Sequence, residues 1–322
     1  MEENNQVIKL RYKEARLGRV FSTHLFDFII SILLAMIILI PSLFILYVTP
    51  VYKNIQESRY NIQTSSHLYI SSESSAVLLS SSLSENNELT YNEKSEQLDS
   101  TLSYFFNEFL VEKGVLSKED KTYTNKLLTY TLNNQNMFDE DSTRLLTLST
   151  FDENYYNTYV DILDNYAVGY LGYVDNYASL RTNLIWCYAF TIYIALTIAN
   201  FIIYLLFPLI FHRGRRTLGM LLNHVNYVSF DGFSPSIKRF LINFLIKWVL
   251  VLSGSIFSFA IPIFISVGMI FLSKHHQSIT DYICGCFLVE NEDLLIYENL
   301  DEYLKSQELI NETQLFDVNK KQ

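Results

Sequence analysis

Ionisable side chains at the edges of apolar runs are the residues of this sequence best suited to chemistry. Asp27 stands at the entrance of an apolar run from Phe26 to about Thr49, and Arg19 precedes it by eight residues. An ionised group beside a membrane span must be paired or face water, so it is by default a candidate functional site. Eight residues make just over two helical turns, so both side chains share a helix face but lie about 12 Å apart along the axis. We therefore expect Asp27 to be paired with another element.

Two interpretations of these charges stay open. Arg216 and Arg239 are candidate partners of Asp27, and Asp281 is expected to take an arginine such as Arg19. In the first interpretation this ionic network only holds the first span against an inner loop. This reading is favoured because Asp27 lies near the interface rather than the bilayer centre. In the second, Asp27 binds and releases a proton or a cation.

Other chemistry has little support. His275 and His276 lie near Asp281, but adjacent residues on a helix diverge by about 100°, which is poor geometry for two metal ligands. Cys284 and Cys286 flank one glycine, a pattern more typical of small-residue packing. The sequence has no nucleophile elbow, P-loop or H-E-x-x-H motif. We therefore expect no catalytic residue, no metal, no cofactor and no enzyme activity.

Three apolar regions place the protein among multi-pass α-helical membrane proteins, since about 20 apolar residues cross a bilayer. Low glycine and proline contents, 10 and 5 residues, favour long helices. The fold class predicted is all-α, with three to four membrane helices, an interfacial amphipathic helix and a helical extracytoplasmic insertion domain. The expected segments are a basic cytoplasmic N-terminus at 1–25, a first membrane helix at 26–49, an outer helical domain at 50–182, a second membrane helix at 183–211, a basic cytoplasmic loop at 212–239, a third apolar region at 240–273 and an acidic tail at 274–322.

The third apolar region is too long for one upright span. Its 34 residues would form a helix of about 51 Å. Arg239, Asn243 and Lys247 recur at helical spacing and predict one polar face on an otherwise apolar helix. Either this helix lies on the inner surface before a single span, or a bend near Gly254 or Pro262 makes a hairpin. The hairpin, with a cytoplasmic tail, is favoured by the basic residues that follow.

Charge distribution predicts the orientation. Residues 1–26 carry five basic and three acidic side chains, residues 212–247 carry six and one, and residues 51–182 carry nine and nineteen. Basic flanks mark the cytoplasmic side, so 50–182 is expected outside. Nucleic-acid binding is not expected, because the basic clusters are short and adjoin apolar segments.

The outer segment is expected to be helical, with a helix ending at Gly114 and a second over residues 121–135. Its tyrosines between 155 and 177 are interpreted as core or interfacial packing rather than as a ligand-stacking surface. Expected partners are the lipid bilayer, an envelope component bound through residues 50–182, and a second copy of the chain as an open alternative.

Three blocks resemble the RDD family of bacterial integral membrane proteins, which is named for one arginine and two aspartates. They are RLGRVFSTHLFDFII, GRRTLGMLLNHVNYVSFDGFSPSIKRFLINFL and SKHHQSITDYICGCFLV. The sequence departs at Met220, where a lysine is usual, and at Cys284 and Cys286, where the family prefers alanine and threonine. By resemblance the name-giving residues are Arg19, Asp27 and Asp281, and the structural motif positions are Thr217, Gly219, Asp231, Gly232, Pro235 and Gly285.

The resemblance covers roughly 11–49 and 183–290, so the outer segment looks like an insertion. It implies location in the bacterial plasma membrane and a role in transport of small ions or other small solutes. The alternative is a non-transporting interaction or sensor protein whose outer domain binds a partner.

Overall fold

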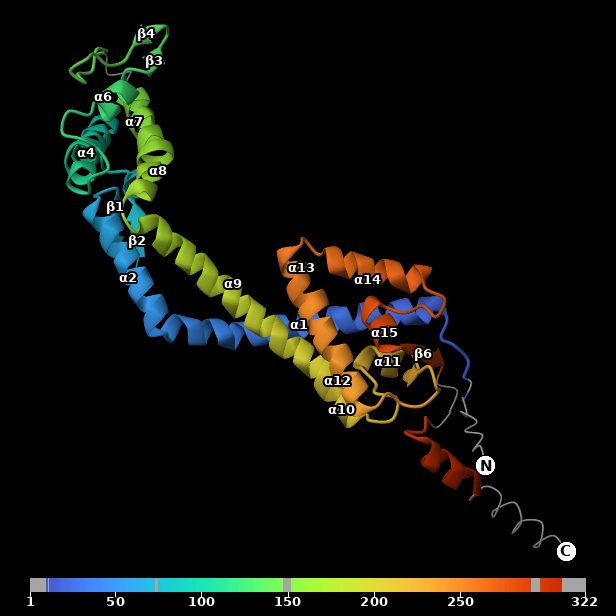
Figure 1. Cartoon of the computed structure of the whole chain (residues 1–322). Helices are drawn as coiled ribbons and strands as arrows, with labels where there is room; N and C mark the ends of the chain where they lie inside the picture. Colours follow the sequence, from blue (N-terminus) through green and yellow to red (C-terminus); the bar gives the residue numbers. More distant parts are fainter. Residues whose placement is uncertain (1–9, 11, 73–74, 147–151, 291–295, 309–322) are drawn as a thin grey trace, which may run out of the picture. The chain divides into compact units, whose positions relative to one another are not determined.

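A computed structural model describes residues 10, 12–72, 75–146, 152–290 and 296–308 (Figure 1). The chain forms two compact units. Unit 1 comprises residues 1–42 and 191–322, and unit 2 comprises residues 43–190. Helices α1 (Leu17–Val48) and α9 (Tyr177–Phe201) have residues in both units.

Unit 1 contains most of α1, the end of α9 and the shorter elements that follow. These are η5 (Ile202–Leu206), α10 (Phe207–Ile210), α11 (Leu218–Leu222), β5 (Val225–Ser229), α12 (Ile237–Ile246), η6 (Lys247–Ser253), α13 (Gly254–Phe257), α14 (Ile261–Leu272), α15 (Ile279–Cys284) and β6 (Cys286–Glu290), and residues 300–308 are helical.

A small β layer joins three distant parts of unit 1. Strands β5 and β6 pair antiparallel, with Tyr227 opposite Leu288. The N-terminal segment adds to β6, because Glu14 bridges to Val289 and the Ala15 amide donates to the Leu288 carbonyl at 3.0 Å. The core beneath this layer is formed by Ala15, Val20, Met220, Val225, Tyr227, Ile270, Cys286 and Leu288.

Two helical stretches in the described part of the chain are long and apolar enough to cross a bilayer. They are Leu17–Val48, with 32 residues, and Tyr177–Ile210, with 34. Few of their apolar side chains are buried and many are exposed, as in Ile37 and Phe44 of α1 and Phe190 of α9. Exposed apolar rows of this length are typical of helices in contact with lipid.

The third apolar region is bent, as the hairpin alternative predicts. Helices α13 and α14 are separated by a turn in which Phe259 and Ala260 have φ of 50° and 64° (Figure 1). The predicted polar stripe of α12 is divided: Asn243 is 5% exposed, whereas Ile242 and Leu245 are exposed. Asn243 and Lys247 therefore face the interior of unit 1, where they find partners, and Arg239 stays exposed.

Unit 2 is formed by short helices and two small hairpins. Its elements before α9 are α2 (Pro50–Ser65), β1 (Tyr69–Ser72), β2 (Ser75–Leu78), α3 (Leu79–Glu85), α4 (Tyr91–Tyr104), η1 (Phe105–Phe109), α5 (Leu110–Glu112), α6 (Thr122–Leu127), β3 (Thr131–Leu132), β4 (Gln135–Asn136), α7 (Asp152–Asp161), η3 (Ile162–Ala167), α8 (Val168–Tyr170) and η4 (Leu171–Tyr173).

The core of unit 2 is aromatic and lies between α4–η1 and α7–η3. Phe105 and Tyr159 are both fully buried, and the rings of Phe106 and Tyr123 stack with centroids 5.5 Å apart. Two of the predicted tyrosines, Tyr155 and Tyr159, thus pack in the core, which confirms that interpretation for them.

The mainly helical character is confirmed, but a strictly all-α class was too narrow, because the described residues form three two-stranded sheets. The helix through α5 is followed by Gly114 at φ 71°, as predicted. The helix expected over residues 121–135 was wrong: α6 ends at Leu127, and Asn133 and Asn134 adopt positive φ in the β3–β4 turn. Asparagine tolerates this conformation, so a tight hairpin replaces the helix there.

Replacing Leu98 of α4 by alanine tests the unit 2 core. Leu98 is fully buried, so we expect a loss of about 2–5 kcal/mol in unfolding free energy. Leu145→Ala is the matched control, because Leu145 is 49% exposed, and should cost at most about 0.5 kcal/mol. Amide hydrogen exchange of residues 91–112 in detergent measures the unfolding free energy of both variants. Equal protection in the two variants would contradict the assigned core.

Candidate functional site

Asp27 is buried in unit 1, where neutral donors hold it. Its side chain is 1% exposed. The Thr217 hydroxyl donates to Oδ2 at 2.5 Å and the Gly219 amide donates to Oδ1 at 2.7 Å. The structure therefore does not pair Asp27 with Arg216 or Arg239. The T-L-G motif places a hydroxyl and a backbone amide at the start of α11, and a buried carboxylate is stabilised by such donors.

Gly219 lets α11 approach α1 closely. A β-carbon at this position would lie 2.4 Å from the Thr23 carbonyl oxygen and 2.8 Å from Asp27 Oδ1. Both distances are shorter than any stable contact, so only glycine fits here. The close approach is what brings the Gly219 amide within reach of the carboxylate.

Asp281 is the second buried carboxylate and is also held by neutral donors. Ser278 donates to Oδ2 at 2.6 Å, Asn243 donates to Oδ1 at 3.2 Å, and Tyr227 makes a short hydrogen bond to Oδ1. Asn243 also donates to the Tyr227 hydroxyl at 2.8 Å. This network joins α12, β5 and α15. Arg19, the partner predicted for Asp281, lies elsewhere.

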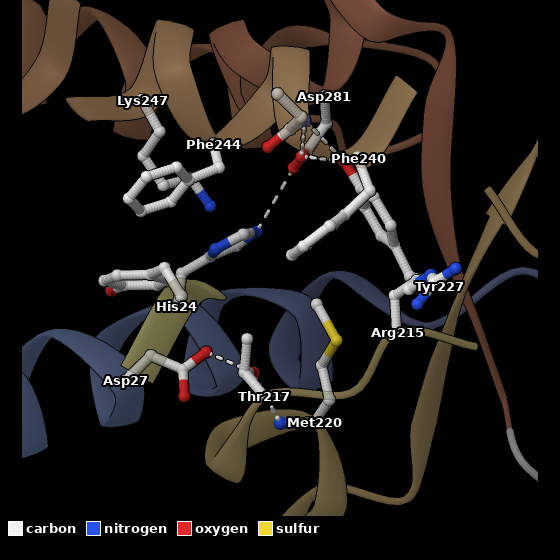
Figure 2. A pocket seen from close by; sticks show the side chains of 12 residues that line it. His24, Asp27, Arg215, Thr217, Met220, Tyr227, Phe240, Phe244, Lys247 and Asp281 are labelled. Atoms are coloured by element: carbon white, nitrogen blue, oxygen red, sulfur yellow. Dashed lines mark hydrogen bonds and ion pairs between the residues drawn. The ribbon is translucent and has the colours of Figure 1, made fainter. Parts of the chain in front are cut away.

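A cavity of about 20 Å³ lies between the two carboxylates, which is room for about one water molecule. Figure 2 shows Asp27 and Asp281 on opposite sides, with His24 and the end of Lys247 between them. His24 Nε2 lies 3.6 Å from Asp281 Oδ2, and it has no hydrogen-bond partner among the described residues although it is buried. His24 is therefore placed to form an ion pair with Asp281 when it is protonated.

Two π-helical segments converge on this cavity. Tyr204 lies on η5 and Lys247 begins η6. The Lys247 ammonium lies 4.7 Å from the centre of the Tyr204 ring, a cation–π contact. No described residue forms an ion pair with Lys247 within 4 Å. Short π-helical segments inside α-helices are frequent at functional sites.

Electrostatics favour an ionised Asp281. Burial raises the pKa of this carboxyl. The charges of Lys247 and His24 and the hydrogen bonds from Ser278 and Tyr227 lower the pKa by more than burial raises it. The pKa of Asp281 is therefore held below its ordinary value. Burial, and then the Asp281 charge, raises the pKa of Tyr227, so that its hydroxyl remains a donor.

Arg19 belongs to a separate ionic cluster around Glu290. This carboxylate is only 2% exposed and contacts Lys13 at 2.6 Å, Arg19 at 3.6 Å and Arg16 at 3.7 Å. The hydrogen bond from Lys13, followed by the charges of Arg19 and Arg16, holds the pKa of Glu290 below its usual range against the effect of burial. The cluster fastens the N-terminal segment to the end of β6.

The other motif residues shape turns around the site. Asp231 accepts the Phe233 amide at 3.3 Å, and Gly232 has φ 86°, with the Leu10 carbonyl where a β-carbon would lie. The Pro235 carbonyl accepts Arg215 Nε at 3.4 Å. Gly285 ends α15 at φ 64°.

The two remaining predicted arginines do not reach either carboxylate. Arg239 is exposed. Arg216 is partly buried and its Nε has no partner among the described residues, and burial lowers the pKa of this guanidinium.

Sequence reasoning placed His24 among the polar groups near Asp27 in the ion-pathway interpretation, but it missed Lys247, Asn243 and Tyr227 as parts of the same cluster. The signal for two of them was visible, because Asn243 and Lys247 belong to the polar stripe on α12. Its orientation could not be predicted without the Asp281 partner. The described residues contain no group of three His, Cys, Asp or Glu side chains able to hold a metal ion.

The buried charges and the two long apolar helices define the class as an integral membrane protein with a polar site beside its helices. The model of the RDD family, a membrane-associated family, matches residues 160–285 of the chain. The match contains Thr217, Gly219 and Asp281 but not Arg19 or Asp27. No curated protein and no solved structure matches significantly.

Gly219→Ala tests the α1–α11 approach. The new methyl group would clash with the Thr23 carbonyl, so we expect a loss of about 1–3 kcal/mol in stability, read as a lower melting temperature. Gly268→Ala in α14 is the matched control, since nothing lies within 4 Å of a β-carbon there. If both variants melt alike, the close approach is not real.

Glu290→Gln tests the N-terminal cluster through its pH dependence. A carboxyl whose pKa falls on folding stabilises the folded state above its ordinary pKa of about 4.3, and this contribution is lost as the pH falls. We expect the variant to melt below the wild type at pH 7, and the difference to shrink as the pH falls below about 4 and through the lowered pKa of Glu290. Glu308→Gln, an exposed position, is the control. A pH-independent difference would show that charge is not the cause.

Proposed function

We propose that this protein moves a small ion, a proton or a monovalent cation, through the cavity between Asp27 and Asp281. The observation that supports the proposal is a pair of buried carboxylates held by neutral donors on opposite sides of a small cavity. Burying a charge is costly unless it is compensated. If the two carboxylates served only to hold the helices together, each would be expected to form a direct ion pair with a fixed cation.

The charge balance of the cavity supports an exchangeable positive charge. Two carboxylates face one ammonium, Lys247, and a histidine whose Nε2 has no hydrogen-bond partner in the described part of the chain. Arg215 also lines the cavity, but its Nε is directed to the Pro235 carbonyl and its guanidinium lies over the Phe240 ring. With His24 neutral, Asp27, Asp281 and Lys247 together carry one net negative charge. A proton on His24 or a small cation would balance that charge.

The pairing of β5 with β6 supports a membrane topology for the proposed transporter. β5 precedes the α12–α14 hairpin and β6 follows it, yet the two strands are paired, and residues 13–15 contact β6. These three parts must share one side of the membrane, so the chain between β5 and β6 crosses twice or not at all. α14 has only 12 residues, about 18 Å, against a hydrocarbon core of about 30 Å. We infer a hairpin that enters and leaves on that side.

The basic flanks make that side the cytoplasm and put unit 2 outside, in a bacterial plasma membrane. In this proposal the protein is a multi-pass transporter without enzyme activity, and unit 2 is an outer domain. The rival function is a non-transporting interaction protein, in which unit 2 binds an envelope component and the buried charges are scaffolding.

Ion flux in liposomes tests the proposal. The purified full chain is reconstituted in liposomes that contain a dye specific for H⁺, Na⁺ or K⁺, and a gradient of the matching ion is imposed in each experiment. The best variant is His24→Asn, because His24 Nε2 has no hydrogen bond to lose among the residues that the structure describes. Asp27→Asn is a poorer choice, since an amide would oppose one of the two donors and cost about 1–3 kcal/mol.

We expect wild-type flux under at least one gradient and a decrease of about tenfold or more in His24→Asn. His224→Asn is the matched control, because His224 is exposed and asparagine tolerates its φ of 52°. Melting temperatures confirm that both variants are folded. Absence of wild-type flux under every gradient, or undiminished flux in a folded His24→Asn protein, would contradict the proposal.

A further inference from the structure

The acidic C-terminal segment is docked on the loop that forms one wall of the cavity. Arg213 Nη2 contacts Glu302 Oε1 at 2.8 Å and His212 Nε2 lies 3.7 Å from Glu298 Oε1. The Ser234 amide donates to the Tyr297 carbonyl at 2.9 Å. The sequence alone indicated no partner for this segment. These contacts show that it binds the loop at residues 212–213 and Ser234.

An apolar contact accompanies the charged ones. Ile296 is 2% exposed and packs with Val228 of β5 and Val289 of β6. Tyr12 of the N-terminal segment borders the same cluster. The tail therefore covers a surface made from the β layer and residues 212–213, and its acidic side chains match the basic loop.

The residues that follow in this loop contact the site. The Gly214 carbonyl accepts the Tyr227 amide at 2.9 Å, Arg215 lines the cavity, and the Thr217 hydroxyl binds Asp27. Only three residues separate Arg213, which the tail holds, from Thr217. Arg215 has φ 44°, a left-handed conformation that a non-glycine residue keeps only where its surroundings impose it.

The charged contacts of the docked segment are weak enough to be reversible. Arg213 and Glu302 side chains are 50% and 32% exposed, and His212 and Glu298 are 59% and 45% exposed. Ion pairs with this exposure contribute little and are screened by salt. A contact of this kind can be released by a small change in conditions, whereas the carboxylate networks inside the site cannot.

We propose that residues 296–308 are a latch that holds the loop 212–217 against the cavity and restrains ion passage. Releasing the latch frees the loop that carries Arg215 and Thr217 and increases flux. This part of the inference rests on the proposed function, but docking of the tail on the loop can be measured without any transport.

Charge reversal in the full chain tests the latch. The variants are Arg213→Glu, Glu302→Arg and the double swap, and Asp301→Arg is the matched control because Asp301 is exposed and adjacent to Glu302. Hydrogen exchange of residues 296–308 and 212–217 is measured for each protein, together with flux in liposomes.

Each single variant should accelerate exchange in both segments by about fivefold and raise flux by about fivefold. The double swap should restore wild-type values, and Asp301→Arg should resemble the wild type. Unchanged exchange in both single variants would overturn the docking. Faster exchange of 296–308 with an unchanged loop, or with unchanged flux in a protein that transports, would overturn the latch. If the wild type passes no ion, the proposed function fails and loop exchange alone decides whether the tail restrains the loop.

Discussion

The structure of unit 1 depends on how the Asp27 carboxylate is kept in a buried place. A hydroxyl and a backbone amide, both from the first turn of α11, bind its two oxygens. These donors reach Asp27 only because Gly219 has no side chain, so the position of α11 against α1 is fixed by one carboxylate and one glycine. From α11 the chain enters β5, which carries Tyr227 to Asp281. The second carboxylate is thereby positioned relative to the first through a short, continuous path.

In unit 1, positioning of the helices and exchange of charge fall to different side chains. Asp27 is bound on both oxygens and acts mainly in positioning, while the space between Asp27 and Asp281 is left to His24 and Lys247. His24, whose Nε2 has no hydrogen bond to any described residue, and the Lys247 ammonium, which lies over an aromatic ring, can both change partners at low cost. Groups that can exchange partners are the ones an ion pathway requires, whereas the two carboxylate networks provide a fixed frame.

Much of the architecture could be predicted from the sequence, because it depends on local patterns. The first two apolar runs, the helix end at Gly114 and the bend in the third apolar region follow from composition, spacing and turn chemistry. The partners of the charged residues could not be predicted. Asp27 and Thr217 are 190 residues apart, and Arg19 binds Glu290 rather than an aspartate. The stripe on α12 was misread for the same reason: helical spacing shows that polar residues share a face, but only the fold shows that Asp281 lies opposite that face.

The protonation state of His24 is the most direct test of the claim that the cavity exchanges a positive charge. Nitrogen NMR of the ¹⁵N-histidine-labelled protein, with the His24 signal assigned by its loss in His24→Asn, reports whether the ring is neutral or charged. The account predicts that this signal changes between the two forms across the pH range in which the protein stays folded, and that added Na⁺ or K⁺ shifts the change if a cation competes for the site. A ring that stays neutral throughout, with or without either cation, would make His24 a core side chain and contradict the account.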